Sequence, residues 1–233
     1  MTMTMTTTIA DSSLDLGLLR LMQLSSPSFP VGAFAYSQGL EGAIHNEWVT
    51  DAGSAVDWIR GLLNQTLATL DVPILSRAIT AWAAGDLSRV QSLSALQLAC
   101  REARELQEED LQLGRALLRA LGNLGVTQAL DAPGDTTYCV AFGLAAHHFG
   151  IDVSRAATGY LYAWCDNQVI AASRLIPLGQ SQAQQVLSAC LLTIPSAVTR
   201  GLSLADGDLG LTAPGLGLAS AQHETQYARL FRS

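Results

Sequence analysis

The sequence predicts an all-α protein that folds as a single-domain helical bundle of about eight to ten helices. Apolar residues recur at the spacing of three and four that marks one face of a helix, without useful runs of alternating β-branched residues. The 233 residues, 49% of them hydrophobic, fit one domain and can bury a substantial core. No repeat or linker divides the chain, so one domain is expected over residues 14–233.

Capping residues and prolines place the boundaries of these helices. Thr50 or Asp51, Asp86 and Asp152 suit N-cap positions, because their side-chain oxygens can accept a hydrogen bond from the first helical turn. Residues 1–13 are expected to form a disordered tail. The expected helices cover residues 14–24, 35–46, 51–67, 71–82, 86–96, 99–121, 135–149, 152–176, 180–202 (bent near Pro195) and 217–229.

Charge composition excludes several functions. The chain carries 20 acidic and 13 basic residues, a net charge of -7, which argues against binding to nucleic acid or anionic lipid. Every basic residue is arginine, so a P-loop lysine, a Schiff-base lysine and a Ser-x-x-Lys nucleophile are all excluded. Because only 14% of the residues are charged, against roughly 25% in an average domain, we expect an extensive protein interface.

Cysteine spacing and the apolar runs point to a cytoplasmic protein. The four cysteines are far apart and form no Cys-x-x-Cys pair, which is typical of buried free thiols in a reducing compartment. The N-terminus lacks the basic start and the apolar core of a signal peptide. The longest uncharged run, 175–199, is interrupted by Pro177 and Pro195, so no membrane span is expected.

Candidate metal-binding and catalytic residues are sparse. His147 and His148 are adjacent and would point about 100° apart on a helix, so they cannot bind one ion as an i, i+4 pair does. No Gly-x-Ser-x-Gly motif occurs, and nothing in the spacing of Glu41 and Glu224 brings them together as acid and base. The sequence therefore predicts neither an enzyme nor a stably bound cofactor or metal.

One charged helix contains a conspicuous exception to its apolar stripe. Asp110 falls on the stripe of the helix expected over 99–121, so its carboxylate needs a partner. The arginines and glutamates between 101 and 109 favour a solvated face with i, i+4 ion pairs.

Two segments combine aromatic residues with unusual neighbours. Residues 26–41 contain rigid prolines, permissive glycines and the aromatic residues Phe29, Phe34 and Tyr36, which either anchor an interface or pack in the core. Residues 223–233 place Leu230 and Phe231 between arginines. This segment either orders on a partner or docks on the chain's own bundle.

These segments resemble the UreF family of urease accessory proteins. The resemblance runs from about Leu18 to Ser233 and is specific, because several unusual motifs occur in order. The motifs are Leu-Ser-Ser-Pro-Ser-Phe-Pro-Val-Gly at 24–32, Tyr-Ser-Gln-Gly-Leu-Glu at 36–41, Arg-Glu-Ala-Arg-Glu at 101–105, Gln-Val-Ile-Ala-Ala at 168–172, Pro-Leu-Gly-Gln at 177–180, and the terminal 223–227 and 229–233.

The resemblance implies a non-catalytic maturation factor. Members of this family dimerise and bind the accessory protein UreD, also called UreH. That complex recruits the nickel-carrying GTPase UreG and delivers Ni²⁺, which passes transiently through the assembly, to the urease apoprotein. A modulator of the GTPase activity of UreG without a direct role in metal passage is the alternative. A further one is a nickel carrier that uses His147, His148, Cys165 or His223.

The resemblance also implies which residues contact partners. The tail residues are expected to contact UreD/UreH, and the loop residues form a second candidate surface. Arg174 stands where some relatives are expected to have lysine, and its different geometry would alter how the GTPase is gated. The expected interaction residues are Phe34, Tyr36, Glu41, Gln168, Arg174, Tyr227, Arg229, Leu230, Phe231 and Arg232.

Overall fold

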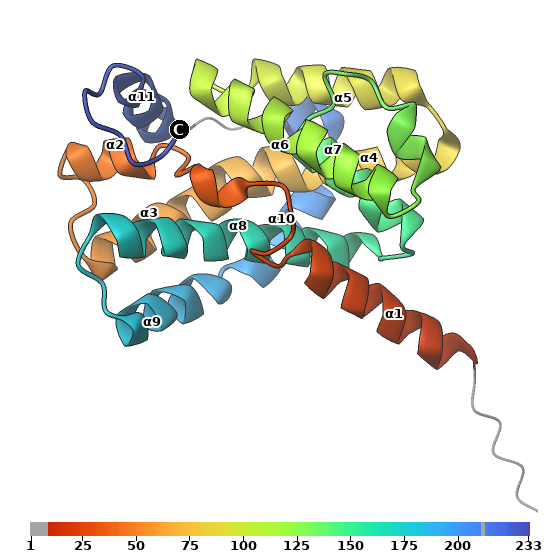
Figure 1. Cartoon of the computed structure of the whole chain (residues 1–233), viewed down its shortest axis with the longest axis horizontal. Coiled ribbons are helices and arrows are strands. Elements are labelled where there is room, and N and C mark those ends of the chain that lie inside the picture. Colours follow the sequence, from red (N-terminus) through yellow and green to blue (C-terminus); the bar gives the residue numbers. More distant parts are fainter. Residues whose placement is uncertain (1–8, 211–212) are drawn as a thin grey trace, which may run out of the picture.

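The computed structural model describes residues 9–210 and 213–233, which form helices joined by short loops without any strand (Figure 1). The α-helices are α1 (Ile9–Leu24), α2 (Leu40–His45), α3 (Ala52–Leu62), α4 (Val72–Ala84), α5 (Leu87–Ala99), α6 (Arg104–Asn123), α7 (Tyr138–His148), α8 (Val153–Leu175), α9 (Gln180–Leu191), α10 (Ile194–Ser203) and α11 (Pro214–His223). Three short 3₁₀ turns, η1 (Ala33–Ala35), η3 (Thr127–Leu130) and η4 (Asp206–Asp208), lie in the connections.

Some of these helices join into longer rods. A π-helical segment, η2 (Leu63–Asp71), links α3 to α4 without a break, and only a short turn at Leu192 and Thr193 separates α9 from α10. Over the described ranges the chain therefore forms about nine rods, which confirms the predicted all-α bundle. The expected restart at Asp71 is wrong, because Pro73 sits where α4 continues the π-helical turn.

The predicted aspartate caps explain where three helices begin. Asp51, Asp86 and Asp152 each accept a hydrogen bond from the backbone N–H three residues later, at 2.8, 2.9 and 3.0 Å. These bonds satisfy first-turn donors that would otherwise have no partner. The starts of α3, α5 and α8 confirm the sequence-based boundaries.

Other boundaries differ from the expectation. The helix expected over 35–46 is shortened to α2, because Gln38 (φ 52°) and Gly39 (φ 77°) adopt left-handed backbone conformations that end the preceding turn. The helix expected from 99 begins only at Arg104. The helix expected over 217–229 covers Pro214–His223, and α1 begins five residues earlier than expected; residues 1–8 of the expected tail lie outside the described part.

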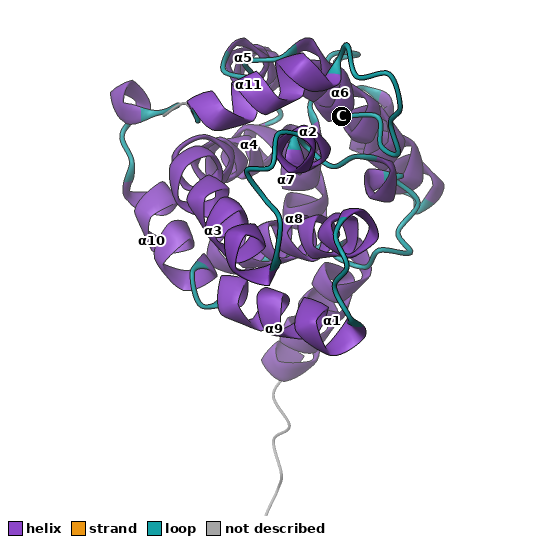
Figure 2. Ribbon diagram, turned by 90° about the vertical axis from the view of Figure 1, so that its left-hand side faces the viewer, coloured by secondary structure: helices purple, strands orange, loops and turns teal. Residues whose placement is uncertain are grey.

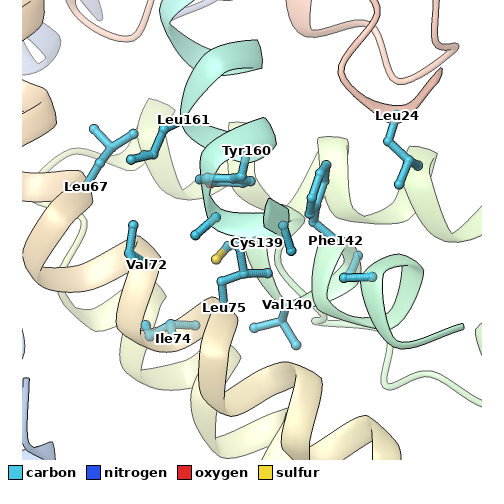
Figure 3. Close-up of a cluster of buried hydrophobic side chains, with 14 of the residues drawn as sticks. Leu24, Leu67, Val72, Ile74, Leu75, Cys139, Val140, Phe142, Tyr160 and Leu161 are labelled. Carbon is cyan, nitrogen blue, oxygen red and sulfur yellow. The ribbon is translucent and has the colours of Figure 1, made fainter. Parts of the chain in front are cut away.

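The main core lies where α4, α7 and α8 pack together (Figure 3). Leu75, Phe142 and Leu161 are fully buried there, and α8 runs through the middle of the bundle (Figure 2). The indole N–H of Trp82 donates to the Val140 carbonyl at 2.9 Å, so the largest core side chain leaves no donor without a partner.

A buried ionic cluster connects several helices beside this core. The Arg101 guanidinium lies 2.7 Å from both Asp71 and Asp110, while Asp71 also accepts hydrogen bonds from Gln97 and Tyr160. Burial alone would lower the pKa of Arg101, but the charges of Asp110 and Asp71 raise it above its usual value. Burial raises the pKa of Asp110, and Arg101 opposes that shift.

Arg101 is the partner that the Asp110 carboxylate was expected to need. The partner comes from the loop before α6 and not from a solvated helix face, so for Asp110 the expectation of an exposed face is wrong. Arg104 and Glu108, by contrast, form the expected exposed i, i+4 pair at 2.7 Å.

One stretch among the described residues, Gln180–Ser203, is long and apolar enough to cross a membrane by length and composition, with a mean hydropathy of 1.3. It comprises α9 and α10, and its Val186, Cys190 and Val198 side chains are buried in the core. Core helices often pass the same test, so this stretch is a weak indication of a span.

Candidate docking surface formed by the tail and the loop

The loop before α2 turns one aromatic side chain outward and two inward. Phe29 and Tyr36 are buried, which confirms core packing for these two, whereas Phe34 on η1 is 56% exposed, so an interface role for Phe34 stays a prediction. The Tyr36 hydroxyl donates to Gln112 Oε1 on α6 at 2.6 Å. The loop is thus fixed to the body while it presents Phe34 to solvent.

The C-terminal tail, residues 224–233, docks on the chain's own bundle beside α2, α6 and α11 (Figure 1). Glu41 on α2 holds its main chain: the Glu41 carboxylate accepts the backbone N–H of Leu230 at 2.7 Å and that of Phe231 at 2.8 Å. Hydrogen bonds to an ionised carboxylate are about twice as strong as neutral ones, so these two contacts fix the position of the tail.

A row of ionisable side chains extends from this carboxylate. The fully buried His223 at the end of α11 lies between two carboxylates, with Nε2 3.1 Å from Glu41 and Nδ1 2.7 Å from Glu105. Arg229 then pairs with the other oxygen of Glu105 at 2.7 Å. The row connects α2, α11, α6 and the tail.

A second set of contacts fixes the last residues. The backbone N–H and the hydroxyl of Ser37 donate to the Ser233 carbonyl, and the Ser233 hydroxyl donates to Glu109 at 2.7 Å. Gln38 donates to the other oxygen of Glu109 at 2.6 Å. Burial raises the pKa of Glu109 to about 7, although both hydrogen bonds oppose the shift.

Some side chains of the tail are buried and others are exposed. Phe231 is 6% exposed and packs in a small apolar cluster with Leu40, Ala172 and Ile176. Tyr227 is fully exposed, and Leu230 is 62% exposed. An apolar side chain left in water on an otherwise docked tail is typical of a surface that binds another protein.

Two neighbouring hollows lie beneath the loop. The outer one, of about 70 Å³, lies between the loop, α6 and α8, and the inner one, of about 30 Å³, reaches Asp71 and Arg101. Both are lined by Gln38, Glu109, Asp110, Tyr160 and Trp164. Carboxylates thus line a space that is large enough for water.

Comparison with known proteins decides the family. The UreF family model matches residues 49–191. The chain is 40% identical over 230 residues to the urease accessory protein UreF of Marinomonas sp. (strain MWYL1), covering 99% of both chains. It is 45% identical over 222 residues to that of Chromohalobacter salexigens, covering 94% of this chain and 95% of the relative. The chain belongs to the UreF family.

The structure of this UreF-family chain brings most of the expected interaction residues together. Glu41, Arg229, Leu230 and Phe231 contact one another or share the row of ionisable side chains. Gln168 on α8 is buried and donates to the Ser37 carbonyl at 3.0 Å, so it positions the loop. The other expected residues, Phe34, Tyr36, Tyr227 and Arg232, lie on the same loop or tail.

Arg174 does not join this group of UreF residues. It lies exposed in the last turn of α8, and no hydrogen bond or ion pair links its side chain to the described residues. The effect of arginine at this position on GTPase gating stays a prediction.

The candidate nickel-carrying residues are not gathered in one site. His147 and His148 lie on α7, Cys165 is buried on α8, and His223 ends α11. The part of the chain that the structure describes contains no group of three or more histidine, cysteine, aspartate or glutamate side chains that could hold a metal ion. The two nitrogens of His223 also face opposite carboxylates, so Glu41 and Glu105 do not converge on one point.

The sequence did not indicate the partners of Glu41 and the tail. His223 lies 182 residues from Glu41 in the chain, and Glu105 and Glu109 are read most simply as members of an exposed charged face. The one available signal was the Glu41 carboxylate itself, next to apolar Leu40 on the same short helix. A charge at such a position needs partners, but local spacing cannot name them.

Proposed function

We propose that this UreF-family protein is a non-catalytic cytoplasmic scaffold for urease maturation. As a homodimer it binds UreD/UreH through the tail and the adjoining loop and recruits the GTPase UreG for nickel insertion into apo-urease. The tail supports this proposal most directly, because it is held by Glu41 and Ser37 while Tyr227 and Leu230 remain in solvent. A tail already in place loses little conformational entropy on binding.

The contact with UreD/UreH is tested by changing exposed tail side chains. The Tyr227→Ala, Leu230→Ala double variant removes apolar surface without touching a buried contact, so circular dichroism should stay helical while co-purification with UreD/UreH is lost. Leu192→Ala is the control, because Leu192 is 82% exposed on the turn between α9 and α10. Unchanged co-purification of the double variant would remove the tail from the interface.

Deletion of residues 229–233 gives a stronger version of the same test. It removes the Phe231 anchor as well as the Arg229 ion pair. The helical body should persist, because the main core lies elsewhere, and complex formation should be abolished.

A direct part in nickel passage is supported by the two neighbouring hollows, whose shared lining includes the acidic side chains of Glu109 and Asp110. Carboxylate and water ligands suit magnesium, calcium and manganese, whereas nickel prefers imidazole, so these oxygens are expected to bind nickel weakly. Equilibrium dialysis of the isolated protein at micromolar nickel should therefore show no stable retention. Stoichiometric retention would favour the carrier that uses histidine and cysteine.

GTP turnover by UreG, measured with and without this protein, separates the scaffold from the GTPase modulator. The modulator would be favoured by two results together. The protein would change the GTP turnover of UreG, and a variant with a narrowed hollow would still activate urease normally. Ala163→Leu enlarges a side chain in the lining of the outer hollow without removing a member of the Arg101 cluster, so it is suited to narrowing that hollow, and circular dichroism checks its fold.

A further inference from the structure

An open hollow on the other side of the loop has an unusual lining for so acidic a chain. It measures about 420 Å³ and lies between the loop at Val31–Tyr36, the exposed side of α6 and the end of the tail. Three of its lining residues are the arginines Arg115, Arg119 and Arg232, and its lining contains no aspartate or glutamate. Three of the 13 cations thus face one space on a molecule with a net charge of -7.

These arginines have no anionic partner among the described residues. Six of the other ten arginines each pair with a carboxylate: Arg77, Arg89, Arg101, Arg104, Arg155 and Arg229. Arg115, in contrast, only approaches the Gly134 carbonyl, and Arg232 is held through its backbone N–H, which donates to Ala35. Arg115 and Arg119 are also four residues apart on α6, where like charges repel. An anionic ligand would relieve this repulsion.

The hollow also contains an exposed aromatic side chain. Phe34 is 56% exposed at its edge, and the Tyr36 hydroxyl bond to Gln112 fixes the loop that carries it. Guanidinium groups match carboxylates in a bidentate geometry, and an exposed aromatic ring offers an apolar anchor. A ligand that fits both features combines carboxylates with an apolar side chain.

We infer that this arginine hollow, formed by Arg115, Arg119, Arg232 and Phe34, docks an acidic segment of a protein partner that places an apolar side chain against Phe34. The inference rests on the proposed function for the assumption that the partner is a protein. Beyond the proposed function, the inference specifies that the docked segment is acidic and that it binds a face of α6, which the family resemblance did not single out.

A titration of the full chain tests the inference directly. The probe is a capped pentapeptide of four glutamates around one leucine, and the readout is the side-chain Nε–Hε NMR signals of the arginines. Signals of Arg115, Arg119 and Arg232 should shift, whereas those of Arg104 and Arg155 should not. Equal shifts at all exposed arginines, or no shifts, would overturn the inference. Inorganic phosphate is the second arm, and shifts with phosphate alone would also overturn it.

A charge-reversed variant links the hollow to assembly. The R115E, R119E double variant should weaken co-purification with the urease accessory proteins at low salt by at least about tenfold. Charge pairs across an interface affect both the rate of association and the rate of dissociation, and reversing two charges would turn attraction into repulsion. The R104E, R155E variant changes the net charge equally at exposed sites away from the hollow and should bind within about twofold of the wild type. Circular dichroism checks both folds.

The two experiments distinguish two kinds of failure. If the wild type binds the accessory proteins and R115E, R119E binds equally well, the arginine hollow is not a docking site and the proposed function stands. If the wild type binds none of them, the proposed function fails, and the peptide titration alone decides whether the hollow accepts an acidic segment.

Discussion

At the scale of single residues, Glu41 makes contacts that no neighbour can replace. Its carboxylate accepts two tail N–H groups and faces the buried His223 ring. Glu41→Ala leaves these donors without acceptors, so the free energy of unfolding should fall by roughly 2–4 kcal/mol. Urea unfolding measures the change. Glu224→Ala, at an exposed position without an ion pair to the described residues, should change it by less than about 0.5 kcal/mol.

Glu109 predicts a dependence of stability on pH. Its pKa is raised from 4.5 to about 7 by burial, so the folded protein binds a proton that the unfolded chain has lost. The resulting stabilisation is complete below about pH 4.5 and disappears as the pH rises through about 7. Glu109→Gln keeps a neutral side chain at every pH.

The variant should therefore gain stability relative to the wild type between pH 4.5 and 7, by up to roughly 3 kcal/mol. Urea midpoints of both proteins at several pH values give the difference. A difference that stays constant across this range would show that Glu109 ionises normally in the fold.

At the scale of secondary-structure elements, α2 and α11 touch through their backbones. A Cβ at Gly42 would lie 2.3 Å from the Ala219 carbonyl oxygen. Gly42→Ala should therefore force the two helices apart and lower the free energy of unfolding by about 1–3 kcal/mol. It should also expose the tail, because His223 and Glu41 would separate.

Gly61 in α3 provides the matched control. A Cβ there meets nothing within 4 Å, so Gly61→Ala should raise the free energy of unfolding by about 0.5–1 kcal/mol through its better helix propensity. Thermal unfolding and limited proteolysis of the tail compare both variants. Equal stability of the two would mean that the contact between α2 and α11 adjusts without cost.

Elements with local signals were predictable, and those fixed by distant contacts were not. The caps at Asp51, Asp86 and Asp152 act within three residues, so sequence placed those helices well. The break at Gln38 depends on Glu109 and Trp164, which hydrogen-bond to its side chain from far along the chain. Apolar periodicity alone therefore extended α2 too far towards its N-terminus.

The same distinction applies to the candidate site. The aromatic and arginine residues of the tail drew attention to this segment, but its attachment to α2 could be seen only in the fold. Composition likewise indicated a surface poor in charge, yet it did not reveal that three of the arginines face one hollow.

At the scale of the whole molecule, one buried ion cluster joins the π-helical segment, the loop before α6, α6 itself and α8. Arg101→Met would leave Asp71 and Asp110 without their shared cation. The free energy of unfolding should then fall by roughly 3–5 kcal/mol. Arg104→Met breaks only an exposed pair and should cost no more than about 0.5 kcal/mol.

Urea denaturation followed by circular dichroism compares the two arginine variants. Hydrogen exchange should also show faster opening of both α6 and α8 in Arg101→Met, since Asp110 and Tyr160 bring them to the same cluster. Similar midpoints for the two variants would assign the cluster a minor part in global stability.

The hold of Glu41 on main-chain amides has a consequence for how such a protein changes over evolutionary time. Every residue except proline has the same backbone N–H, so the hydrogen bond from position 230 to Glu41 does not depend on the side chain at that position. Backbone atoms thus attach the tail to α2, whereas side-chain atoms form its exposed surface. Substitutions at 227 and 230 would therefore change the exposed surface of the tail while Glu41 still holds the segment in place.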